Sequence, residues 1–531
     1  MIDALIARFA APDACAAELL CDTHPEETVA FTVVERDLST RNVTFGELRR
    51  ESARFASALT DLGIDQGDAV GVLMGKSVEL VVALLGIWRR GAVHVPLFTA
   101  FARPAISLRL LAAEAKLVVV DADQRGKLAA GEGIPAAPSW QLVVVGGEPG
   151  RGEHSFDALM AVADEDTQVA TVGGDGPLVL LFTSGTTGDP KGVAVPLRAV
   201  ASFVAYLELG LDVRTDDVYW NAADPGWAYG LYYAIIAPLA AGRRSVLLRA
   251  GFSAPLTWQV LERLRVTNLA AAPTVYRALA ADADGPPAGL ALRRASSAGE
   301  PLTPDVVEWS AGALGVEVRD HYGQTEHGMV IANGWADEVR ADVLPGSMGR
   351  TLPGWSTAVL ADDSDQPAPP GVQGRVAIDV PGSPLLWFGG YAGDPERTAA
   401  RYTADGRWYL TGDAGSVDEN GYYFFSSRDD DVIIMAGYRI GPFEVESVLV
   451  QHEAVAEAAV VGMPDPLRGE VLEAFVVLKP GTDPGPGFGE ELRQLVKTRF
   501  AAHAYPRTVH IVDSLPKTPS GKVQRYVLRG R

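Results

Sequence analysis

The sequence predicts an α/β fold with a large N-terminal domain, residues 1–428, and a small α+β domain, residues 429–531. The chain has 531 residues, which is too long for one core, because single cores rarely exceed about 250–300 residues. Strand-like and helix-like segments alternate through most of the chain, which is typical of α/β proteins. After about Arg428 the pattern changes to short strands and helices, enough for a separate domain of roughly a hundred residues.

The first elements illustrate the alternation. Thr44-x-x-Glu47 has the form of a capping box, and apolar residues at helical spacing follow it. The next segments are predicted as a strand, an apolar helix and a second strand, over residues 68–74, 77–88 and 92–97. Strand–helix–strand alternation predicts a parallel sheet with helices on its faces, and the pattern recurs from Leu178 onward.

The C-terminal part has its own set of elements. Strands are predicted over 455–461, 472–478 and 509–512, and helices over 442–452 and 490–501. Loops rich in Gly, Pro and Asp are predicted over 283–289, 361–371 and 481–487.

Composition narrows the function. The net charge is −21, from 46 Lys+Arg and 67 Asp+Glu, without a long basic run, which argues against binding to nucleic acid or an anionic membrane. With only Cys15 and Cys21, neither a disulfide framework nor a cysteine-based zinc site is expected. The first residues do not resemble a signal peptide, so a cytoplasmic location is expected.

One uncharged stretch, Pro225–Gly242, is long enough to raise the question of a membrane span. It is interrupted by Gly226, Gly230 and Pro238 and is rich in aromatic residues. We therefore expect buried segments that line a pocket.

The segment Thr183-Ser-Gly-Thr-Thr-Gly-Asp-Pro-Lys-Gly192 carries the strongest chemical signal. It follows an apolar run, residues 178–182, that predicts a buried strand. Glycine and hydroxyl residues after a strand suit a loop whose N–H groups, hydroxyls and lysine surround an anion, and we expect that anion to be a nucleotide triphosphate. Residues Gly71–Ser77 resemble a second kind of phosphate loop, the Walker A loop. Three residues separate the two glycines here, whereas a Walker A loop needs four. Lys76 and Ser77 are therefore interpreted as the start of a surface helix.

Further phrases follow in order: Ser297-Ala-Gly-Glu-Pro301, Asp320-His-Tyr-Gly-Gln-Thr-Glu326, Tyr409-Leu-Thr-Gly-Asp413, Arg428–Glu446 and Leu515-Pro-Lys-Thr-Pro-Ser-Gly-Lys-Val-Gln-Arg525. Together with the phosphate loop they resemble the AMP-forming acyl-CoA synthetase and adenylation superfamily. The resemblance runs from about Glu27 to Arg525. Within the superfamily the chain is most similar to medium-chain acyl-CoA synthetases, which are relatives of acetyl-CoA synthetase.

The resemblance assigns the nucleotide site. It implies a large N-terminal adenylation domain of several subdomains and a C-terminal lid joined by a hinge. The implied ATP contacts are Thr183, Ser184, Gly185, Thr186, Thr187, Lys191, Gly299, Glu300, Pro301, Asp320, His321, Tyr322, Gly323, Gln324, Thr325, Asp413, Arg428 and Arg439. Among them Tyr322 would lie against adenine, and Asp413 and Arg428 would contact the ribose.

The resemblance also assigns catalytic roles. Lys522 would reach the α-phosphate and the attacking carboxylate, Thr325 would bond the α-phosphate, and Glu326 would hold Mg²⁺ as a hard oxygen ligand. Asp430 would be the hinge residue. Ala436, Gly437 and Tyr438 would line the coenzyme A tunnel.

The acyl pocket is assigned to four positions: Trp227, Tyr229, Tyr276 and Gly323. Acetyl-CoA synthetases carry a tryptophan at the position of Gly323, so glycine there predicts a pocket longer than acetate. For each aromatic residue, plain core packing is an equally good interpretation.

The implied activity is ATP-dependent ligation of a short- to medium-chain carboxylic acid to coenzyme A through an acyl-adenylate, with release of AMP and pyrophosphate. The small-molecule partners are the acid, ATP and coenzyme A. The sequence leaves open an adenylation enzyme that loads a carrier-protein thiol, a P-loop ATPase or kinase, and a silent binding protein. It also leaves open the acid, the pathway and the oligomeric state, with a homodimer among the options.

Overall fold

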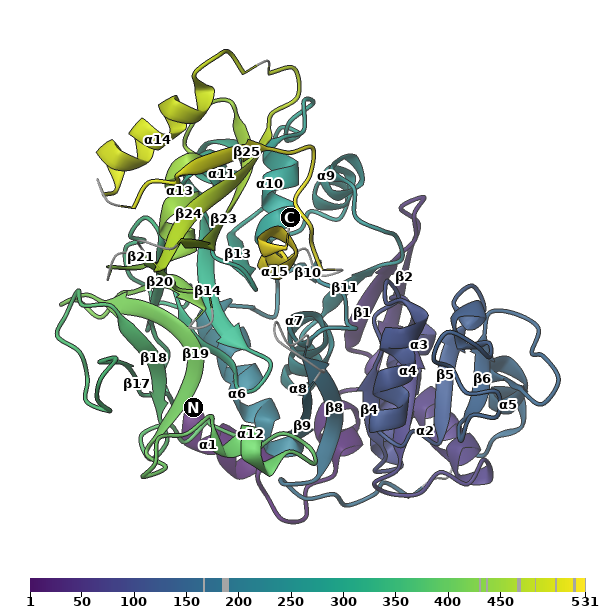
Figure 1. Cartoon of the computed structure of the whole chain (residues 1–531). Helices are drawn as coiled ribbons and strands as arrows, with labels where there is room; N and C mark the ends of the chain where they lie inside the picture. The colour runs from purple at the N-terminus through teal and green to yellow at the C-terminus, as the bar shows by residue number, and fades with distance from the viewer. Residues whose placement is uncertain are drawn as a thin grey trace.

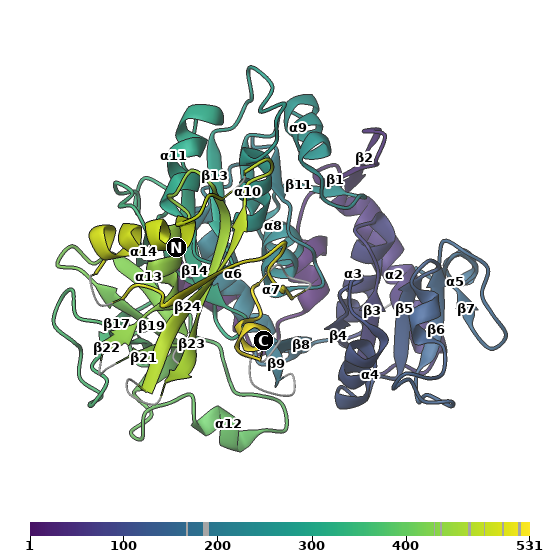
Figure 2. The same ribbon diagram turned by 45° about the horizontal axis from the view of Figure 1, so that its top comes forward.

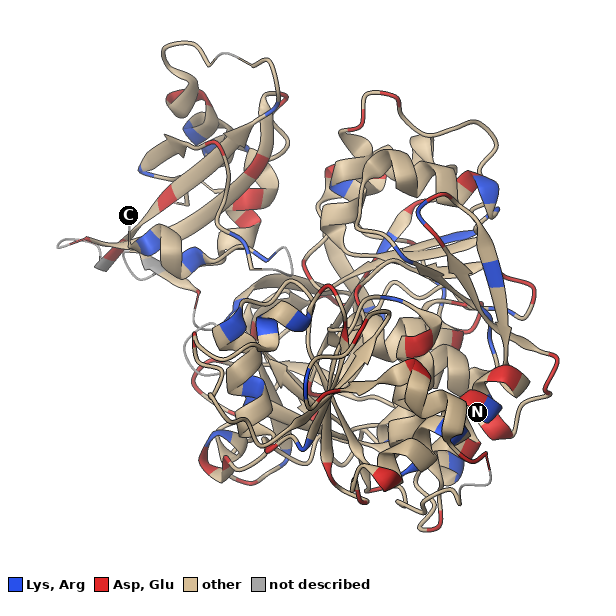
Figure 3. Cartoon of the chain, turned by 90° about the vertical axis from the view of Figure 1, so that its right-hand side faces the viewer, with Lys and Arg blue, Asp and Glu red and all other residues tan. Residues whose placement is uncertain are grey.

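The computed structural model describes residues 1–531 except 166–167, 184–190, 429–430, 436–437, 466–468, 483, 502–503, 519–521 and 531. Three sheets organise the described chain (Figure 1). Two belong to the large N-terminal part, and the third is formed by the residues after Arg428, which form a separate lobe in Figure 3.

The first sheet has 7 strands in the order β7-β6-β5-β3-β4-β8-β9. All its pairings are parallel except that of β8 with β9. Its strands are β3 (Ala69–Leu73), β4 (Val93–Pro96), β5 (Leu117–Asp121), β6 (Gln141–Val145), β7 (His154–Ser155), β8 (Pro177–Thr183) and β9 (Lys191–Pro196). The strands predicted over 68–74 and 92–97 are confirmed, as is the parallel sheet.

The second sheet has 13 strands in the order β17-β18-β19-β20-β16-β15-β14-β13-β12-β10-β11-β1-β2. Neighbours from β14 through β10 to β1 pair in parallel, and the remaining strands are antiparallel. The strands are β1 (Val29–Val34), β2 (Thr40–Thr44), β10 (Tyr219–Asn221), β11 (Ser245–Leu248), β12 (Asn268–Ala271), β13 (Arg294–Ala298), β14 (Val318–Gln324), β15 (Gly328–Ala332), β16 (Ser347–Thr351), β17 (Thr357–Leu360), β18 (Gly374–Asp379), β19 (Trp408–Val417) and β20 (Tyr423–Arg428).

Helices connect and cover these two sheets (Figure 2). They are α1 (Ile2–Phe9), α2 (Phe45–Asp61), α3 (Val78–Arg89), α4 (Arg103–Ala112), α5 (Phe156–Val162), α6 (Val200–Ala205), α7 (Ala228–Gly230), α8 (Ala237–Ala241), α9 (Ala254–Arg263), α10 (Pro273–Ala280), α11 (Pro304–Ala313) and α12 (Pro395–Ala399), with π-helical turns over Glu18–Asp22, Tyr206–Gly210 and Leu231–Ile236 and 3₁₀ turns over Arg125–Leu128 and Leu197–Ala199. The predicted N-cap is confirmed, because the Thr44 hydroxyl accepts a hydrogen bond from the Glu47 N–H at 3.2 Å.

The interpretation of Lys76 and Ser77 as the start of a surface helix is half right. Ser77 caps α3, but the helix is buried from Leu80 to Arg89, because its apolar residues cover every face. Lys76 is half-buried and donates to the Ala222 carbonyl at 2.9 Å, and desolvation of its ammonium group lowers its pKa. Since the ammonium group of Lys76 bonds a backbone carbonyl just after β10, it is not available to a phosphate, and this segment does not form a P-loop.

Most of the segment Pro225–Gly242 is buried, as predicted, while residues 226–229 and 241–242 are half-buried. It forms α7, the following π-helical turn and α8, and Tyr232 and Tyr233 within it are 1% exposed. No helix in the described part of the chain is long and apolar enough to cross a membrane.

The third sheet has 5 strands, with β22-β21-β24-β23 in order and β25 beside β24. Its elements are β21 (Ile433–Met435), β22 (Tyr438–Ile440), α13 (Pro442–Leu449), β23 (Val455–Asp465), β24 (Gly469–Leu478), α14 (Phe488–Arg499), β25 (Thr508–Ile511) and α15 (Arg525–Arg529). A core of its own, which includes Val445, Leu472 and Leu492, holds it together. All the predicted strands and helices of this part are confirmed.

A buried ion pair fastens α3 to the N-terminal segment and gives a stability prediction. Arg89 is 3% exposed and binds both carboxylate oxygens of Asp22, at 2.8 and 2.6 Å. We expect Arg89→Ala to lower the free energy of unfolding by about 3–5 kcal/mol, because it leaves a partly buried carboxylate unpaired. Urea unfolding followed by tryptophan fluorescence measures this. Arg407→Ala, which removes an exposed ion pair with Asp379, should cost at most about 1 kcal/mol, and equal losses would contradict the prediction.

Candidate active site

The predicted phosphate loop joins two antiparallel strands at one edge of the 7-stranded sheet. Thr183 ends β8, Lys191 begins β9, and the two residues pair across the hairpin. The predicted contacts Ser184 to Thr187 lie outside the described residues. The hairpin therefore brings a hydroxyl and an ammonium group to the base of this loop.

The buried carboxylate of Asp413 gathers three other predicted residues. It is 4% exposed, and its Oδ2 accepts hydrogen bonds from the Tyr322 hydroxyl and the Gln324 amide, both at 2.6 Å. Its Oδ1 accepts one from Arg428 Nη1 at 3.1 Å. Tyr322 and Gln324 share a face of β14 because side chains alternate along a strand. Arg428 is the cross-strand partner of Asp413 in the β19–β20 pair. The fold thus unites four residues from distant parts of the chain.

The second acidic residue of the site, Glu326, follows β14 and is 7% exposed. Its Oε1 accepts a hydrogen bond from the Tyr391 hydroxyl at 2.8 Å, and that hydroxyl accepts one from Arg401 Nε at 2.9 Å. Within the described residues no further hydrogen bond reaches this carboxylate, so Oε2 is available to a cation. One carboxylate suits Mg²⁺, which takes most of its other ligands from phosphate and water.

The protein supplies few metal ligands around Glu326. In the described ranges no group of three or more His, Cys, Asp or Glu residues could hold a metal ion. An ion at Glu326 would therefore depend on a phosphate-bearing substrate for its other ligands.

Basic residues converge on the same region. The pKa of Lys191 is lowered, first by burial and then by the positive charges of Arg401, Arg397 and Arg428, while Glu326 opposes the shift. Figure 3 shows acidic and basic residues interspersed over the ribbon, in a chain whose net charge is −21. Cations that repel one another are stabilised by an anion bound between them, so this is where the protein would receive a polyphosphate.

Sequence reasoning missed three of these residues: Tyr391, Arg397 and Arg401. They lie in and around α12, in a segment that contains none of the sequence motifs described above. The available signal was indirect, because an acidic chain must concentrate its few basic residues wherever it binds a polyanion.

Comparisons with known proteins agree with this geometry. A family model described as AMP-binding enzyme matches residues 20–391, and one described as AMP-binding enzyme C-terminal domain matches residues 444–522. The chain belongs to the AMP-binding enzyme family. It is 38% identical to an acetyl-coenzyme A synthetase of Bacillus subtilis, over 92% of this chain and 84% of the relative. It is 35% identical to a mitochondrial acyl-coenzyme A synthetase of Mus musculus, over 92% and 83%.

Solved structures give the same result. A Brucella canis acyl-CoA synthetase is 43% identical, with a TM-score of 0.76 over 100% of this chain and 97% of that chain. An anthranilate CoA ligase in complex with anthranoyl-AMP is 28% identical, with a TM-score of 0.86 over 98% and 97%. The predicted family, the fold class and the acyl-CoA synthetase type of enzyme are confirmed.

In this AMP-binding enzyme the turn after β13 carries three further predicted ATP contacts, Gly299, Glu300 and Pro301. Gly299 has a φ of +103°, a left-handed conformation that favours glycine. Glu300 is held by Arg277 of α10 at 3.0 Å, and the Leu302 N–H donates to Asp320 Oδ2 at 3.1 Å. The turn is thus tied to β14, which carries the predicted ATP contacts Asp320 to Gln324.

Burial raises the pKa of Asp320 to about 8, and the hydrogen bond from the Leu302 N–H opposes the shift. The other carboxylate oxygen, Oδ1, is buried and has no hydrogen-bond partner among the described residues. At neutral pH the carboxyl group therefore keeps its proton.

This shift makes stability depend on pH. Between the ordinary value of 3.8 and about 8 the folded protein binds a proton that the unfolded chain has lost, so the free energy of unfolding falls as pH rises through this window. Asp320→Asn stays neutral, and we expect its melting temperature, relative to wild type, to rise from about pH 6 to about pH 8.5. Scanning calorimetry measures this, and parallel profiles for the two proteins would contradict it.

Tyr229, predicted for the acyl pocket, begins a chain of hydrogen bonds. Its hydroxyl lies 3.3 Å from that of Tyr206, which lies 2.7 Å from His321 Nδ1. His321 Nε2 lies 3.3 Å from the Asn333 carbonyl, which can only accept, so Nε2 carries the proton and Nδ1 accepts from Tyr206. Trp227, the other predicted aromatic residue of this segment, packs edge-on against Phe98.

Two predicted acyl-pocket residues have a packing role. Tyr276 is 0% exposed, and its hydroxyl donates to the Ser296 carbonyl at 2.9 Å. A Cβ atom on Gly323 would overlap the Gly328 carbonyl oxygen and lie 2.7 Å from Met329 Cα. Glycine at 323 thus allows β15 to approach β14, and the inference that it opens the pocket is not supported by the geometry. The longer acyl pocket stays a prediction.

The predicted catalytic lysine lies in the C-terminal part of the enzyme. Lys522 is exposed, and its backbone exchanges hydrogen bonds with Thr518, at 3.1 and 2.7 Å. Three residues on, Arg525 binds Glu446 of α13 at 2.9 Å. Several predicted positions lie outside the described residues or side chains: Asp430, Ala436, Gly437, Tyr438 and Arg439.

Proposed function

We propose that this AMP-binding enzyme joins a short- to medium-chain carboxylic acid to coenzyme A through an acyl-adenylate. The observation that carries the proposal is the proximity of two differently built acidic sites to a cluster of cations. Asp413, surrounded by donors, suits ribose hydroxyls. Glu326, whose Oε2 accepts no hydrogen bond from the described residues, suits a divalent cation. The relatives named acetyl- and acyl-coenzyme A synthetases support the same activity.

In the first half-reaction the carboxylate of the acid attacks the α-phosphorus of ATP, and the bond to pyrophosphate breaks. The chain's own part is to position ATP and to stabilise negative charge. Lys191 and Arg401 would hold the phosphates, while Lys522 would face the attacking carboxylate. Mg²⁺, when bound at Glu326, would neutralise phosphate charge.

In the second half-reaction the thiol of coenzyme A attacks the acyl carbonyl, and AMP leaves. The loop from Ala436 to Tyr438 would line the thiol's path. Because Lys522 and this loop belong to one small domain but serve different steps, that domain, residues 429–531, would rotate about Asp430 between them. The domain boundary, the cytoplasmic location and the homodimer stay predictions.

Release of AMP tests the proposal. Purified enzyme with ATP and Mg²⁺ would be given acids from acetate to decanoate, and branched and aromatic acids, with and without coenzyme A. The proposal expects AMP only when an acid and coenzyme A are both present. ADP as product, or hydrolysis without acid, would refute it. Turnover that needs a carrier protein in place of coenzyme A would favour carrier loading.

A further inference from the structure

One tyrosine connects the acidic and basic groups of the site. The Tyr391 hydroxyl donates to Glu326 Oε1 at 2.8 Å and accepts from Arg401 Nε at 2.9 Å. Its ring lies beneath Lys191, with Nζ 5.0 Å from the ring centroid. We propose that Tyr391 is a positioning residue that fixes the Glu326 carboxylate for Mg²⁺·ATP, with Arg401 fixing the tyrosine. This inference rests on the proposed function.

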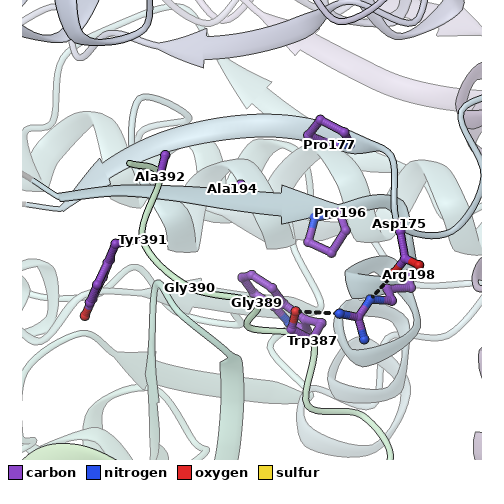
Figure 4. Close-up of a pocket in the computed structure, with 10 residues that line it drawn as sticks. All are labelled: Asp175, Pro177, Ala194, Pro196, Arg198, Trp387, Gly389, Gly390, Tyr391 and Ala392. Carbon is purple, nitrogen blue, oxygen red and sulfur yellow. Dashed lines mark hydrogen bonds and ion pairs between the residues drawn. The ribbon is translucent and has the colours of Figure 1, made fainter. Parts of the chain in front are cut away.

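Backbone contacts also hold Tyr391 in place. Tyr391 forms a bridge with Val193 of β9, and the Ala392 N–H donates to the Gly192 carbonyl at 2.8 Å. Figure 4 shows Tyr391 at one end of a cavity of about 390 Å³ between this segment and the β8–β9 hairpin. Tyr391 therefore has a fixed relation to the strand that follows the predicted phosphate loop.

The fixed hydroxyl matters because a glutamate side chain is flexible. Glu326 has three rotatable bonds, and only one of its oxygens is bonded within the described residues. A donor on Oε1 leaves Oε2 directed at a single place, so the carboxylate is already oriented when the cation arrives. Arg401 prevents the tyrosine hydroxyl from rotating away, because its Nε–H occupies one lone pair of that oxygen.

Tyr391→Phe tests this role, since it removes the hydroxyl and keeps the ring beneath Lys191. We expect acid-dependent ATP–pyrophosphate exchange to fall by about tenfold to a hundredfold, the cost of one hydrogen bond to a charged group. The Mg²⁺ concentration for half-maximal exchange should rise. Calorimetric binding of a non-hydrolysable ATP analogue should weaken in the presence of Mg²⁺ and stay unchanged in its absence. Arg401→Gln should also lower the exchange rate and raise the Mg²⁺ requirement, but it should weaken analogue binding without Mg²⁺ as well, because Arg401 would hold the phosphates directly.

Two comparisons give this test its specificity. Tyr402→Phe removes a hydroxyl that donates to the Phe388 carbonyl at 3.2 Å, away from Glu326, and should leave Mg²⁺ dependence unchanged. In a Glu326→Gln background, Tyr391→Phe should have little further effect, because coupled residues are not additive. An unchanged Mg²⁺ profile for Tyr391→Phe, or an equal change for Tyr402→Phe, would overturn the inference. Wild-type enzyme that releases no AMP would instead refute the proposed function.

Discussion

Lys522→Ala is expected to reduce acyl-adenylate formation by about a hundredfold to a thousandfold, the usual cost of removing one group that stabilises charge in a transition state. Formation of the thioester from preformed acyl-adenylate and coenzyme A should change little. The physical reason is that Lys522 would meet negative charge on the α-phosphate only in the first step. Pyrophosphate exchange measures that step, and thioester release measures the second.

Lys517 offers a matched control for this variant. It lies five residues earlier in the same phrase and forms an ion pair with Glu457 at 2.7 Å. Lys517→Ala should leave both half-reactions near wild-type rates. If Lys522→Ala impaired both steps equally, the assignment of this lysine to adenylation would be wrong.

Asp413→Ala should raise the Michaelis constant for ATP by about a hundredfold to ten-thousandfold. Two ribose hydroxyls would lose a charged acceptor, and each such hydrogen bond contributes about 1.5–3 kcal/mol. The variant should also be less stable by about 1–3 kcal/mol, because the Tyr322 hydroxyl and the Gln324 amide lose their shared partner. Steady-state kinetics with varied ATP and a thermal melt measure the two effects.

Asp418→Ala controls for a general disturbance of the β19–β20 region. Asp418 lies in the turn between these strands and accepts hydrogen bonds from the N–H groups of Asn420 and Tyr422, at 2.9 and 2.8 Å. It should affect stability without changing the Michaelis constant for ATP. The ribose assignment fails if the Asp413 variant keeps a wild-type constant.

Local patterns predicted the local structure well. Thr44 caps its helix as the spacing indicated, and three strands of the 7-stranded sheet, β3, β4 and β8, lie where apolar runs predicted them. The antiparallel strands β16 to β20 were not predicted, because partly exposed strands alternate weakly. The hairpin of β23 and β24 is longer than the predicted strands 455–461 and 472–478, and β23 continues through Gly462 and Pro464, residues that are unusual inside a strand.

The same distinction applies to the candidate site, where local motifs predicted some residues and tertiary contacts brought in others. Asp413, Glu326 and Tyr322 belong to short phrases that a reader of the sequence can recognise. Tyr391 and Arg401 act through contacts made across the fold, and no spacing along the chain reveals such contacts. The sequence does not show burial either. The pKa of Asp320 is raised by the low-dielectric surroundings that the packed sheet provides.

The ion pairs of Arg525 have a mechanical consequence. This residue binds Glu446 at 2.9 Å and Asp431 at 3.6 Å, and Arg529 binds Asp431 at 2.7 Å. Asp431 directly follows the predicted pivot. These pairs hold α15, which follows Lys522 in the chain, to the residue after the predicted pivot, so a rotation at the junction would move Lys522 with it. A small change in the rotation angle at this junction would then produce a larger displacement of Lys522.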